Sequence, residues 1–334
     1  MTTDAATMEA RAAEFRGKFL GLRDEIGKVI VGQRTIIEDV LIAVFAGGHC
    51  LLEGVPGLGK TLLVRTLSEV LDLEYRRIQF TPDLMPADII GTNIVVEDER
   101  GQRRFQFQKG PIFGQIVLAD EINRATPKTQ SALLEAMQEK SVTVGGVNYK
   151  LKPPFFVLGT QNPLEMDGTY PLPEAQLDRF LMKVLVGYPS REELFTVLER
   201  TVDRFADPPR VLMNGAEMEE WKGLVLDVAV APHVRDYGVR IALATHPGGQ
   251  FATPLANKYV RYGSSPRGVQ GLMLSAKIRA LLDSRYNVSF SDLRASAYPV
   301  LRHRLLLNFE GEAEGMSTDE IVKEVLEVTP EQEG

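Results

Sequence analysis

A short glycine-rich segment carries the residues that are most clearly suited to chemistry. Residues 54–61 follow the pattern G-x-x-x-x-G-K-[ST] of a phosphate-binding loop. Glycines allow the backbone to curl so that successive N–H groups point toward phosphate oxygens. A lysine at this place reaches the β- and γ-phosphates of a nucleotide, and the threonine hydroxyl after it can ligate magnesium. The sequence therefore predicts that Lys60 and Thr61 bind a nucleoside triphosphate together with Mg²⁺.

The segments on either side of this loop are the ones that a phosphate-binding loop requires. The apolar run Cys50-Leu51-Leu52 is short enough for a buried strand, and residues 61–67 have apolar side chains at helical spacing. The N-terminus of that helix would direct its positive dipole end toward the same anion. The alternative is a glycine-rich turn that ends in Lys-Thr by chance. The strand, loop and helix in succession argue against it, as do the motifs downstream.

Two adjacent carboxylates follow the next apolar run, residues 116–119. In open α/β sheets, ligands bind outside the carboxyl ends of the strands. We expect Asp120 to hold magnesium there, directly or through water, and Glu121 to orient a water for attack on the γ-phosphate. Carboxylates at a strand end can instead merely cap the next helix. The phosphate-binding loop upstream favours the catalytic interpretation.

Two further segments suggest contacts with a nucleotide. The apolar strand predicted over residues 155–162 ends in Asn162, which could hold the attacking water or the γ-phosphate. An asparagine at a strand end is, however, usually a turn residue. The β-branched run of residues 29–31 leads to Gly32 and Gln33, which suits a linker that packs an apolar wall against a base. An ordinary turn at the end of a helix fits these residues equally well.

Composition limits the class of protein. The 334 residues suffice for two domains, and the net charge of −7 argues against a dedicated nucleic-acid binder, although it leaves room for a local basic channel. The single cysteine, Cys50, cannot form an intramolecular disulfide, which fits a reducing compartment. No apolar stretch of about 18 residues is present, and the N-terminus lacks the apolar core of a signal peptide. We expect a soluble, cytoplasmic protein with no membrane span. The four histidines show no metal-ligand spacing.

The pattern of elements divides the chain into two parts. Strands are expected at residues 50–52, 74–80, 115–121, 155–162 and 181–186, with hairpins at 94–107 and 142–149. Beyond residue 189 the strand signals fade. Helices are expected at residues 190–202, 224–230, 234–245, 269–282, 291–307 and 318–326, with Ser291 and Asp292 capping the fifth. We therefore predict an α/β nucleotide-binding core at 1–188 and an α-helical lid with an acidic tail at 189–334.

Together these stretches resemble the MoxR family of AAA+ ATPases over roughly residues 25–305. Residues 54–61 and 120–125 look like its Walker A and Walker B motifs, and Asn162 matches its sensor 1. Arg179, in the segment 172–180, matches the finger that acts on a neighbour's nucleotide. Arg267, after Ser265-Pro266, matches sensor 2, which reaches the γ-phosphate from the lid. The glycine-rich segment 246–263 departs from the family by looking longer than expected between lid helices.

The resemblance implies a fold, an activity and a set of site residues. The fold is a five-stranded parallel sheet with helices on both faces, a helix-2 insert hairpin, a hairpin before sensor 1, and a helical lid. The activity is magnesium-dependent ATP hydrolysis, with Glu121, Asn162, Arg179 and Arg267 as catalytic residues. The resemblance implies that the remaining nucleotide and magnesium contacts are Gly32, Gln33, Gly54, Pro56, Gly57, Leu58, Gly59, Lys60, Thr61, Leu62 and Asp120, of which Thr61 and Asp120 hold Mg²⁺.

Family members form rings, usually hexamers, and act as chaperone-like remodellers of protein partners, often with a partner that carries a von Willebrand factor A domain. Two other functions share the same nucleotide chemistry. One is a nucleotide-switched scaffold with negligible turnover, against which the complete set of catalytic residues argues. The other is a nucleic-acid-stimulated motor, against which the negative net charge argues.

Overall fold

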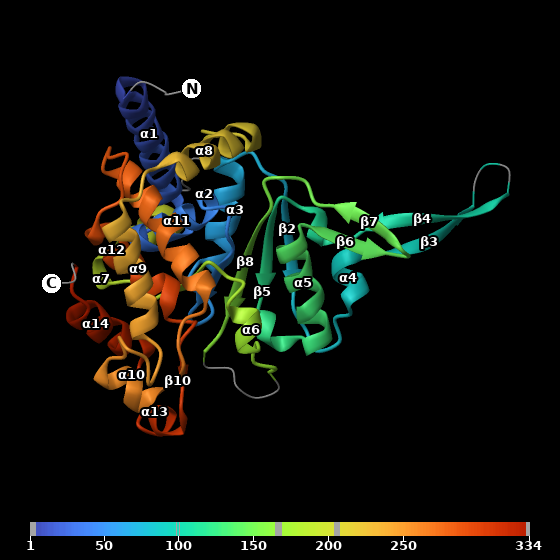
Figure 1. The fold of residues 1–334 in the computed structure, drawn as a ribbon. Helices are drawn as coiled ribbons and strands as arrows, with labels where there is room; N and C mark the ends of the chain where they lie inside the picture. Colours follow the sequence, from blue (N-terminus) through green and yellow to red (C-terminus); the bar gives the residue numbers. More distant parts are fainter. Residues whose placement is uncertain (1–4, 98, 100, 164–168, 204–207, 332–334) are drawn as a thin grey trace.

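The computed structural model describes residues 5–97, 99, 101–163, 169–203 and 208–331. At its centre lies a five-stranded sheet in which every pair of neighbouring strands is parallel (Figure 1). The strands, in spatial order, are β2 (Tyr75–Gln79), β5 (Ile116–Asp120), β8 (Phe156–Gln161), β1 (Cys50–Glu53) and β9 (Met182–Leu185). The predicted fold class is confirmed. Because all five strands run the same way, their carboxyl ends meet at one edge, where the predicted site residues begin.

Helices cover both faces of this sheet. Alternate residues of a strand point to opposite faces, so Leu118 and Leu158 join one core cluster while Val117 and Val157 join the other. The first cluster packs under α1 (Ala5–Val29), α2 (Arg34–Phe45) and α3 (Lys60–Val70), and the second under α4 (Pro86–Ile90) and α5 (Pro127–Glu139). The central strands are buried on both sides, which fixes the positions of their carboxyl ends.

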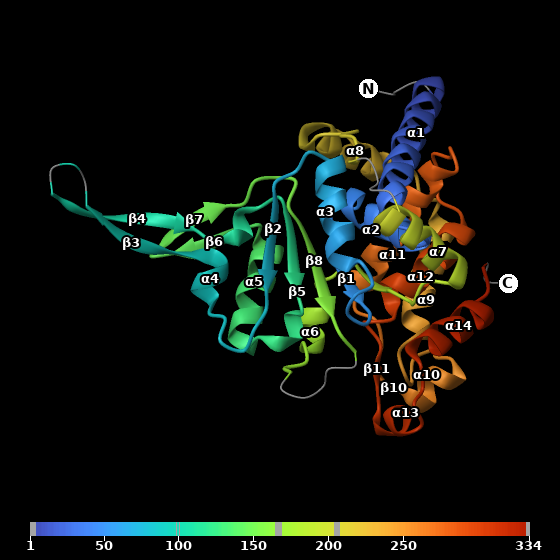
Figure 2. The same ribbon diagram turned by 180° about the vertical axis from the view of Figure 1, so that it is seen from behind.

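The two predicted hairpins are present, and they lie beside α4 and α5 on the second face. One joins β3 (Gly91–Glu97) to β4 (Arg103–Lys109), and the other joins β6 (Ser141–Val144) to β7 (Val147–Lys150). Phe107 stacks on Tyr149 with ring centroids 4.1 Å apart, which joins the two hairpins. Figures 1 and 2 show β3 and β4 projecting away from the body of the molecule. Part of the predicted tip at 97–103 lies outside the described residues, as do the chain ends at 1–4 and 332–334.

The second half of the chain is mainly helical. Its longer elements are α7 (Arg191–Leu198), which continues into a π-helical turn (Glu199–Asp203), α8 (Gly215–Asp227), α9 (Pro232–Ala244), α11 (Pro266–Leu282), α12 (Phe290–Leu301) and α14 (Thr318–Val328). The segment 246–263, which looked long in the sequence, contains α10 (Pro254–Tyr259) and β10 (Val260–Tyr262). Strand β10 pairs antiparallel with β11 (Leu306–Leu307), after which comes α13 (Phe309–Ala313).

Three predictions for this half were wrong in detail. Helix α8 begins at Gly215, well before the predicted start, because Asn214 caps it by accepting from two backbone N–H groups. The helix predicted to run to residue 307 ends at Leu301, since residues 306–307 instead pair with β10. The N-cap of this helix, α12, is Ser289 and not the predicted Ser291. The backbone N–H of Ser289 donates to Asp292 at 2.8 Å.

The helical half packs against the β9 side of the sheet. Helix α11 contacts α1 and α2, and α12 contacts β9, so the N-terminal helix touches both parts of the chain. In Figure 2, α11 and α12 lie beyond α3 and β1, on the side away from the hairpins. The boundary between the two domains, which we placed after residue 188, stays a prediction. Within the described residues, no helix is both long enough and apolar enough to cross a membrane.

Candidate functional site

The glycine-rich loop has the backbone geometry that its sequence predicts. Gly57 and Gly59 have φ angles of +84° and +78°, which residues other than glycine rarely adopt. A Cβ on Gly54 would lie 2.6 Å from the Val186 carbonyl oxygen, so the loop passes directly beside the chain after β9. Helix α3 begins at Lys60, whose Nζ donates to the Gly54 carbonyl. The Lys60 side chain therefore folds back toward the first residue of the loop.

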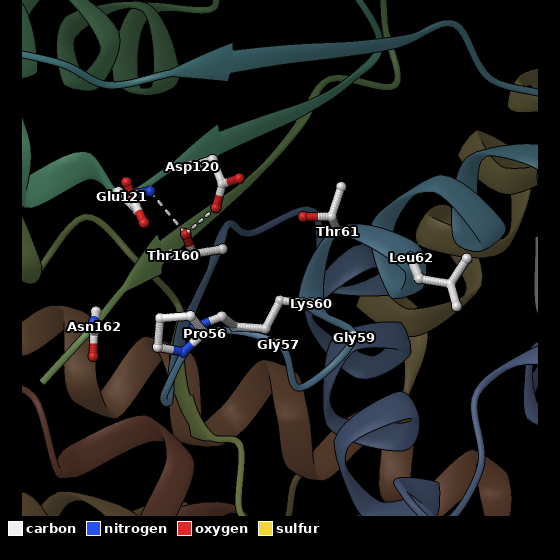
Figure 3. A pocket seen from close by; sticks show the side chains of 10 residues that line it. All are labelled: Pro56, Gly57, Gly59, Lys60, Thr61, Leu62, Asp120, Glu121, Thr160 and Asn162. Atoms are coloured by element: carbon white, nitrogen blue, oxygen red, sulfur yellow. Dashed lines mark hydrogen bonds between the residues drawn. The ribbon is translucent and has the colours of Figure 1, made fainter. Parts of the chain in front are cut away.

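A cavity of about 330 Å³ lies between this loop and the carboxyl ends of β5 and β8 (Figure 3). It is lined by Pro56, Gly57, Gly59, Lys60, Thr61, Leu62, Asp120, Glu121, Thr160 and Asn162. The fold thus brings together three segments that the sequence analysis had singled out separately. Asn162 directly follows β8 and is 6% exposed. Of the lining residues, only Thr160 was not predicted.

Thr160 holds the two carboxylate residues in place. Its hydroxyl donates to Asp120 Oδ1 at 2.6 Å and accepts from the Glu121 backbone N–H at 2.8 Å, as Figure 3 shows. The other oxygen of Asp120, Oδ2, accepts from Arg77 Nη2 at 2.7 Å. A signal for Thr160 existed in the sequence, because a polar residue inside an otherwise apolar buried strand needs a hydrogen-bond partner.

Glu121 is held at the mouth of the cavity by side chains from two directions. Its Oε2 accepts from Gln79 Nε2 at 2.8 Å and from Arg124 Nη1 at 3.0 Å. Its backbone has a φ of +55°, a strained conformation for a residue with a side chain. The sequence analysis missed Gln79, which ends β2, the strand beside β5. Pairing of these two strands can be seen only in the folded sheet.

The donor set at the cavity suits magnesium carried by a nucleotide. Mg²⁺ usually keeps several waters and takes one or two protein oxygens together with substrate phosphates. The Thr61 hydroxyl and the Asp120 carboxylate line one cavity and offer that combination. Among the described residues, no cluster of three or more His, Cys, Asp or Glu side chains could enclose a metal ion on its own. The residues therefore fit a nucleotide-bound magnesium and not an all-protein metal site.

A second cavity, of about 260 Å³, adjoins the first and shares Gly57, Gly59 and Leu62 with it. Its remaining lining is mostly apolar and comprises Val29, Ile30, Val31, Gln33, Leu58, Pro189, Leu194, Val197, Arg200 and Thr201. Gln33 Nε2 donates to the Leu58 carbonyl at 2.9 Å, and its buried Oε1 has no hydrogen-bond partner among the described residues. An apolar slot with one unsatisfied acceptor suits a nucleobase that carries an amino group.

Gly32 and Gln33 were both predicted to contact the nucleotide, but only Gln33 lines this slot. The φ of Gly32 is +75°, and a Cβ there would lie 2.2 Å from the Glu193 carboxylate carbon. Gly32 therefore lets the linker turn closely past the first turn of α7. That helix supplies one wall of the slot through Leu194 and Val197, which the sequence analysis did not assign to the site.

Arg179 and Arg267 do not line either cavity. Arg179 Nη1 donates to the Leu134 carbonyl of α5 at 2.6 Å, and among the described residues no ion pair joins it to Asp178 or Glu174. Arg267 lies in the first turn of α11, as predicted, with Nη1 3.9 Å from Asp178 Oδ2. The two arginines therefore belong to one region, near the end of α6 (Glu174–Leu177), and not to the loop cavity.

Asp178 is the centre of this region. It accepts from Ser265 Oγ at 2.8 and 2.9 Å and from Arg304 Nε at 2.9 Å. Ser265 is also the N-cap of α11, since its Oγ accepts from the Arg267 backbone N–H at 3.1 Å. We call Asp178 with Arg179, Arg267 and Arg304 the arginine cluster.

Arg304 joins the helical half firmly to the segment after Asp178. Its Nη2 donates to the Phe180 carbonyl at 2.7 Å, and the neighbouring His303 Nε2 lies 3.0 Å from the same oxygen. Burial lowers the pKa of Arg304 to about 10, although Asp178 opposes the shift, and burial also holds the pKa of His303 well below its usual range. The sequence analysis missed both residues, because nothing in their local sequence indicates the segment that they contact.

Comparisons with known proteins agree with this geometry. A model described as the ATPase family associated with various cellular activities (AAA) matches residues 49–182, and an AAA lid domain model matches residues 253–325. The chain is 41% identical over 303 residues to Chaperone MoxR1 of Mycobacterium tuberculosis. The matched region covers 91% of this chain and 79% of that protein. The chain belongs to the MoxR family of AAA+ ATPases.

Two further matches extend over almost the whole length. The chain is 44% identical over 308 residues to the uncharacterised protein YeaC of Bacillus subtilis, with 91% of each protein covered. A crystal structure from Cytophaga hutchinsonii, of a protein assigned as an ATPase, has a TM-score of 0.89 at 40% identity and covers 97% of this chain. Membership of this family of ATPases implies that the protein binds a nucleotide and hydrolyses ATP.

Proposed function

We propose that this MoxR-family protein hydrolyses magnesium-bound ATP in a ring of identical subunits and uses the energy to remodel protein partners. One observation carries the proposal. A single cavity is lined by Lys60, Thr61, Asp120, Glu121 and Asn162, which come from three separate segments of the chain. These are the residue types that bind a triphosphate, hold its metal ion and orient a water.

Within this proposal each side chain has its own task. Lys60 contacts the β- and γ-phosphates, while Thr61 and Asp120 ligate Mg²⁺, which would neutralise the charge on the phosphate oxygens. Glu121, anchored by Gln79, accepts a hydrogen bond from the attacking water and orients it. Asn162 lies across the cavity and holds the γ-phosphate or that water.

The base would occupy the apolar slot beside the loop. Leu194 and Val197 offer it an apolar wall, and Gln33 offers an unsatisfied acceptor for an amino hydrogen. An adenine presents such an amino group, as guanine and cytosine do, so the slot is compatible with ATP, and the family of ATPases supports ATP as the nucleotide. Cys50, the single cysteine of the sequence, is fully buried, and burial raises its pKa, so the thiol is unreactive. That inert thiol is compatible with the cytoplasmic location that we propose.

The arginine cluster would act on the nucleotide of the next subunit. Neither Arg179 nor Arg267 lines the cavity of its own subunit. Arg267 lies 3.9 Å from Asp178, and Arg179 is the next residue in the chain. Head-to-tail packing of subunits repeats one contact and closes into a ring when the rotation permits. An arginine that is supplied in this way matches the charge of a transferred phosphoryl group. We propose a hexamer, the assembly that is usual in the family.

The protein partner is inferred from the family and from one surface feature. The relative from Mycobacterium tuberculosis is named a chaperone. The β3–β4 hairpin projects from the body and exposes Val95 and Phe105, the latter with 79% of its surface accessible, which suits contact with a protein. A partner with a von Willebrand factor A domain is our proposal for this chain.

The test is steady-state phosphate release by the wild-type protein and by Glu121→Gln. Glutamine keeps the shape of the side chain but removes the carboxylate that orients water. We expect ATP binding to be kept and turnover to fall by about 10²- to 10⁴-fold. Glu139→Gln, at an exposed position at the end of α5, is the matched control and should behave like the wild type.

Each other outcome points to a different function. A wild-type protein that releases phosphate no faster than Glu121→Gln would be a nucleotide-switched scaffold. Turnover that a polyanion stimulates with steep salt dependence would indicate a nucleic-acid motor. Glu121→Gln should also trap the protein partner in the ATP-bound state, so a pull-down with this variant, with and without ATP, identifies it.

A further inference from the structure

Asp178 adjoins both arginines of the proposed mechanism, Arg179 in the chain and Arg267 in space. It directly precedes Arg179 in the chain, and its Oδ2 lies 3.9 Å from Arg267 Nη1. Ser265 Oγ bridges the same carboxylate to the first turn of α11, because it donates to Asp178 and accepts from the Arg267 backbone N–H. One carboxylate therefore links the segment before β9 to the helix that carries Arg267.

The two arginines that face this carboxylate differ in freedom. The Arg304 side chain is 2% exposed and bonds to Asp178 at 2.9 Å, whereas the Arg267 side chain is 42% exposed and lies 3.9 Å away. Arg304 is also held by the backbone carbonyls of Phe180 and Leu181. Arg304 is thus the fixed counter-charge of Asp178, and Arg267 is the cation that can move away from it.

This asymmetry allows Arg267 to move without exposing an unpaired buried charge. When Arg267 turns toward a phosphate, Asp178 keeps both Arg304 and the Ser265 hydroxyl. Arg179 is held separately, by its bond to the Leu134 carbonyl. Arg267 therefore has a defined starting position beside Asp178, the residue that precedes Arg179, and its side chain is partly exposed.

We propose that Asp178 is a positioning residue that ties Arg267 of the helical half to the segment carrying Arg179, so that both arginines are presented together to one nucleotide on the neighbouring subunit. This inference rests on the proposed function, in which both arginines assist ATP hydrolysis. Asp178 itself contacts no nucleotide in this scheme. It sets the place and direction of Arg267.

The central test compares Asp178→Asn with Arg267→Ala and with the double variant in assembled rings. Asparagine keeps the size of the side chain and one acceptor for Arg304, but it loses the charge that attracts Arg267. We expect kcat for ATP to fall by about 10- to 100-fold, the cost of a misplaced catalytic group. KM should stay within about twofold, because the nucleotide's own cavity is intact. In the Arg267→Ala background, Asp178→Asn should lower kcat no further.

Two further variants separate positioning from stability. Asp319→Asn removes a carboxylate of the helical half that bonds to Arg302 at 2.9 Å and not to Arg267, and it should leave kcat unchanged. Ser265→Ala keeps the charge of Asp178 but removes both the hydrogen bonds to that carboxylate and the N-cap of α11, so it should lower kcat in the same direction by a smaller factor. The Ser265→Ala result decides the question if Asp178→Asn fails to fold.

The outcomes separate this inference from the function on which it rests. If Arg267→Ala and Arg179→Ala are slow but Asp178→Asn and Ser265→Ala turn over like the wild type, the positioning role is wrong and the proposed function stands. If Asp178→Asn lowers kcat by the same factor with or without Arg267, Asp178 does not act through Arg267. Wild-type turnover by Arg267→Ala would remove that residue from the proposed mechanism and would overturn this inference too.

Discussion

The loop cavity and the arginine cluster are built in opposite ways. The cavity collects short segments that end neighbouring parallel strands, so its residues are placed by backbone pairing within one sheet. The cluster joins the end of α6, the start of α11 and the turn after α12, which meet only because the helical half packs against β9. The first can bind a ligand within one subunit. The second presents charges on a surface, and we propose that it acts only against a neighbour.

This difference predicts which substitutions should act within one subunit and which should act through the assembly. A substitution in the cavity should damage the subunit that carries it. A substitution in the cluster should damage the site of the next subunit and leave nucleotide binding in its own subunit intact.

Lys60→Ala should have the largest effect on nucleotide binding. It removes the charge that faces the β- and γ-phosphates, and loss of one partner of a hydrogen-bonded charge pair costs about 2–5 kcal/mol, or about 30- to 5,000-fold in affinity. Titration calorimetry with ATP measures it. Lys128→Ala, at an exposed position in the first turn of α5, is the control. Wild-type affinity in Lys60→Ala would show that the cavity does not bind the triphosphate.

Asp120→Asn should have an intermediate effect that depends on magnesium. The substitution keeps the side-chain shape but removes the charge that attracts Mg²⁺, so the magnesium concentration needed for half-maximal ATP binding should rise by about tenfold. That factor corresponds to about 1.4 kcal/mol. Binding of ATP in the presence of a chelator should stay unchanged. An identical magnesium dependence in both proteins would exclude Asp120 as a ligand.

The third prediction concerns the pH dependence of the stability of the fold, on which two buried histidines report. His49 directly precedes β1. Its Nδ1 accepts from the Val157 N–H at 3.0 Å, and burial lowers its pKa to about 4. His303 lies in the helical half beside Arg304, and burial lowers its pKa as well. Both are neutral in the folded protein, whereas the unfolded chain titrates them near pH 6.5.

The unfolded state therefore binds more protons between about pH 6.5 and pH 4, so the free energy of unfolding should fall as the pH falls through that window. His49 should contribute up to about 3 kcal/mol to that fall. His49→Gln should reduce the slope in urea unfolding experiments at several pH values. His233→Gln, at an exposed position, should leave the slope unchanged. An unaltered slope in His49→Gln would mean that another group dominates acid unfolding.

Sequence and structure agree best where function depends on local geometry. The phosphate-binding loop, the carboxylates after β5 and the asparagine after β8 are all recognisable from a few consecutive residues, and the parallel sheet brings them together as expected. The five-stranded parallel sheet also agrees with what the family resemblance implies. These features share one property, which is that the residues involved lie close together in the chain or at equivalent ends of strands.

The residues that escaped prediction depend on long-range contacts. Gln79 becomes a partner of Glu121 only when β2 pairs with β5. Leu194 and Val197 reach the base slot only when α7 packs over the linker. Arg304 contacts residues more than a hundred positions away. In the same way, helix α12 ends early because residues 306–307 bond to β10. Local patterns hold no information about such partners.

If the arginine cluster works across a subunit boundary, as we propose, two inactive variants should complement each other in mixed rings. An Arg179→Ala subunit keeps a sound cavity, and a Lys60→Ala subunit keeps a sound arginine. Each variant alone should be inactive, since fingers supplied by a neighbour contribute about 10³- to 10⁵-fold to the rate. Mixed rings should regain part of the ATPase activity, because some Arg179→Ala cavities then face an intact Arg179. Mixed rings that demonstrably form but stay inactive, or an isolated monomer with full activity, would contradict the claim.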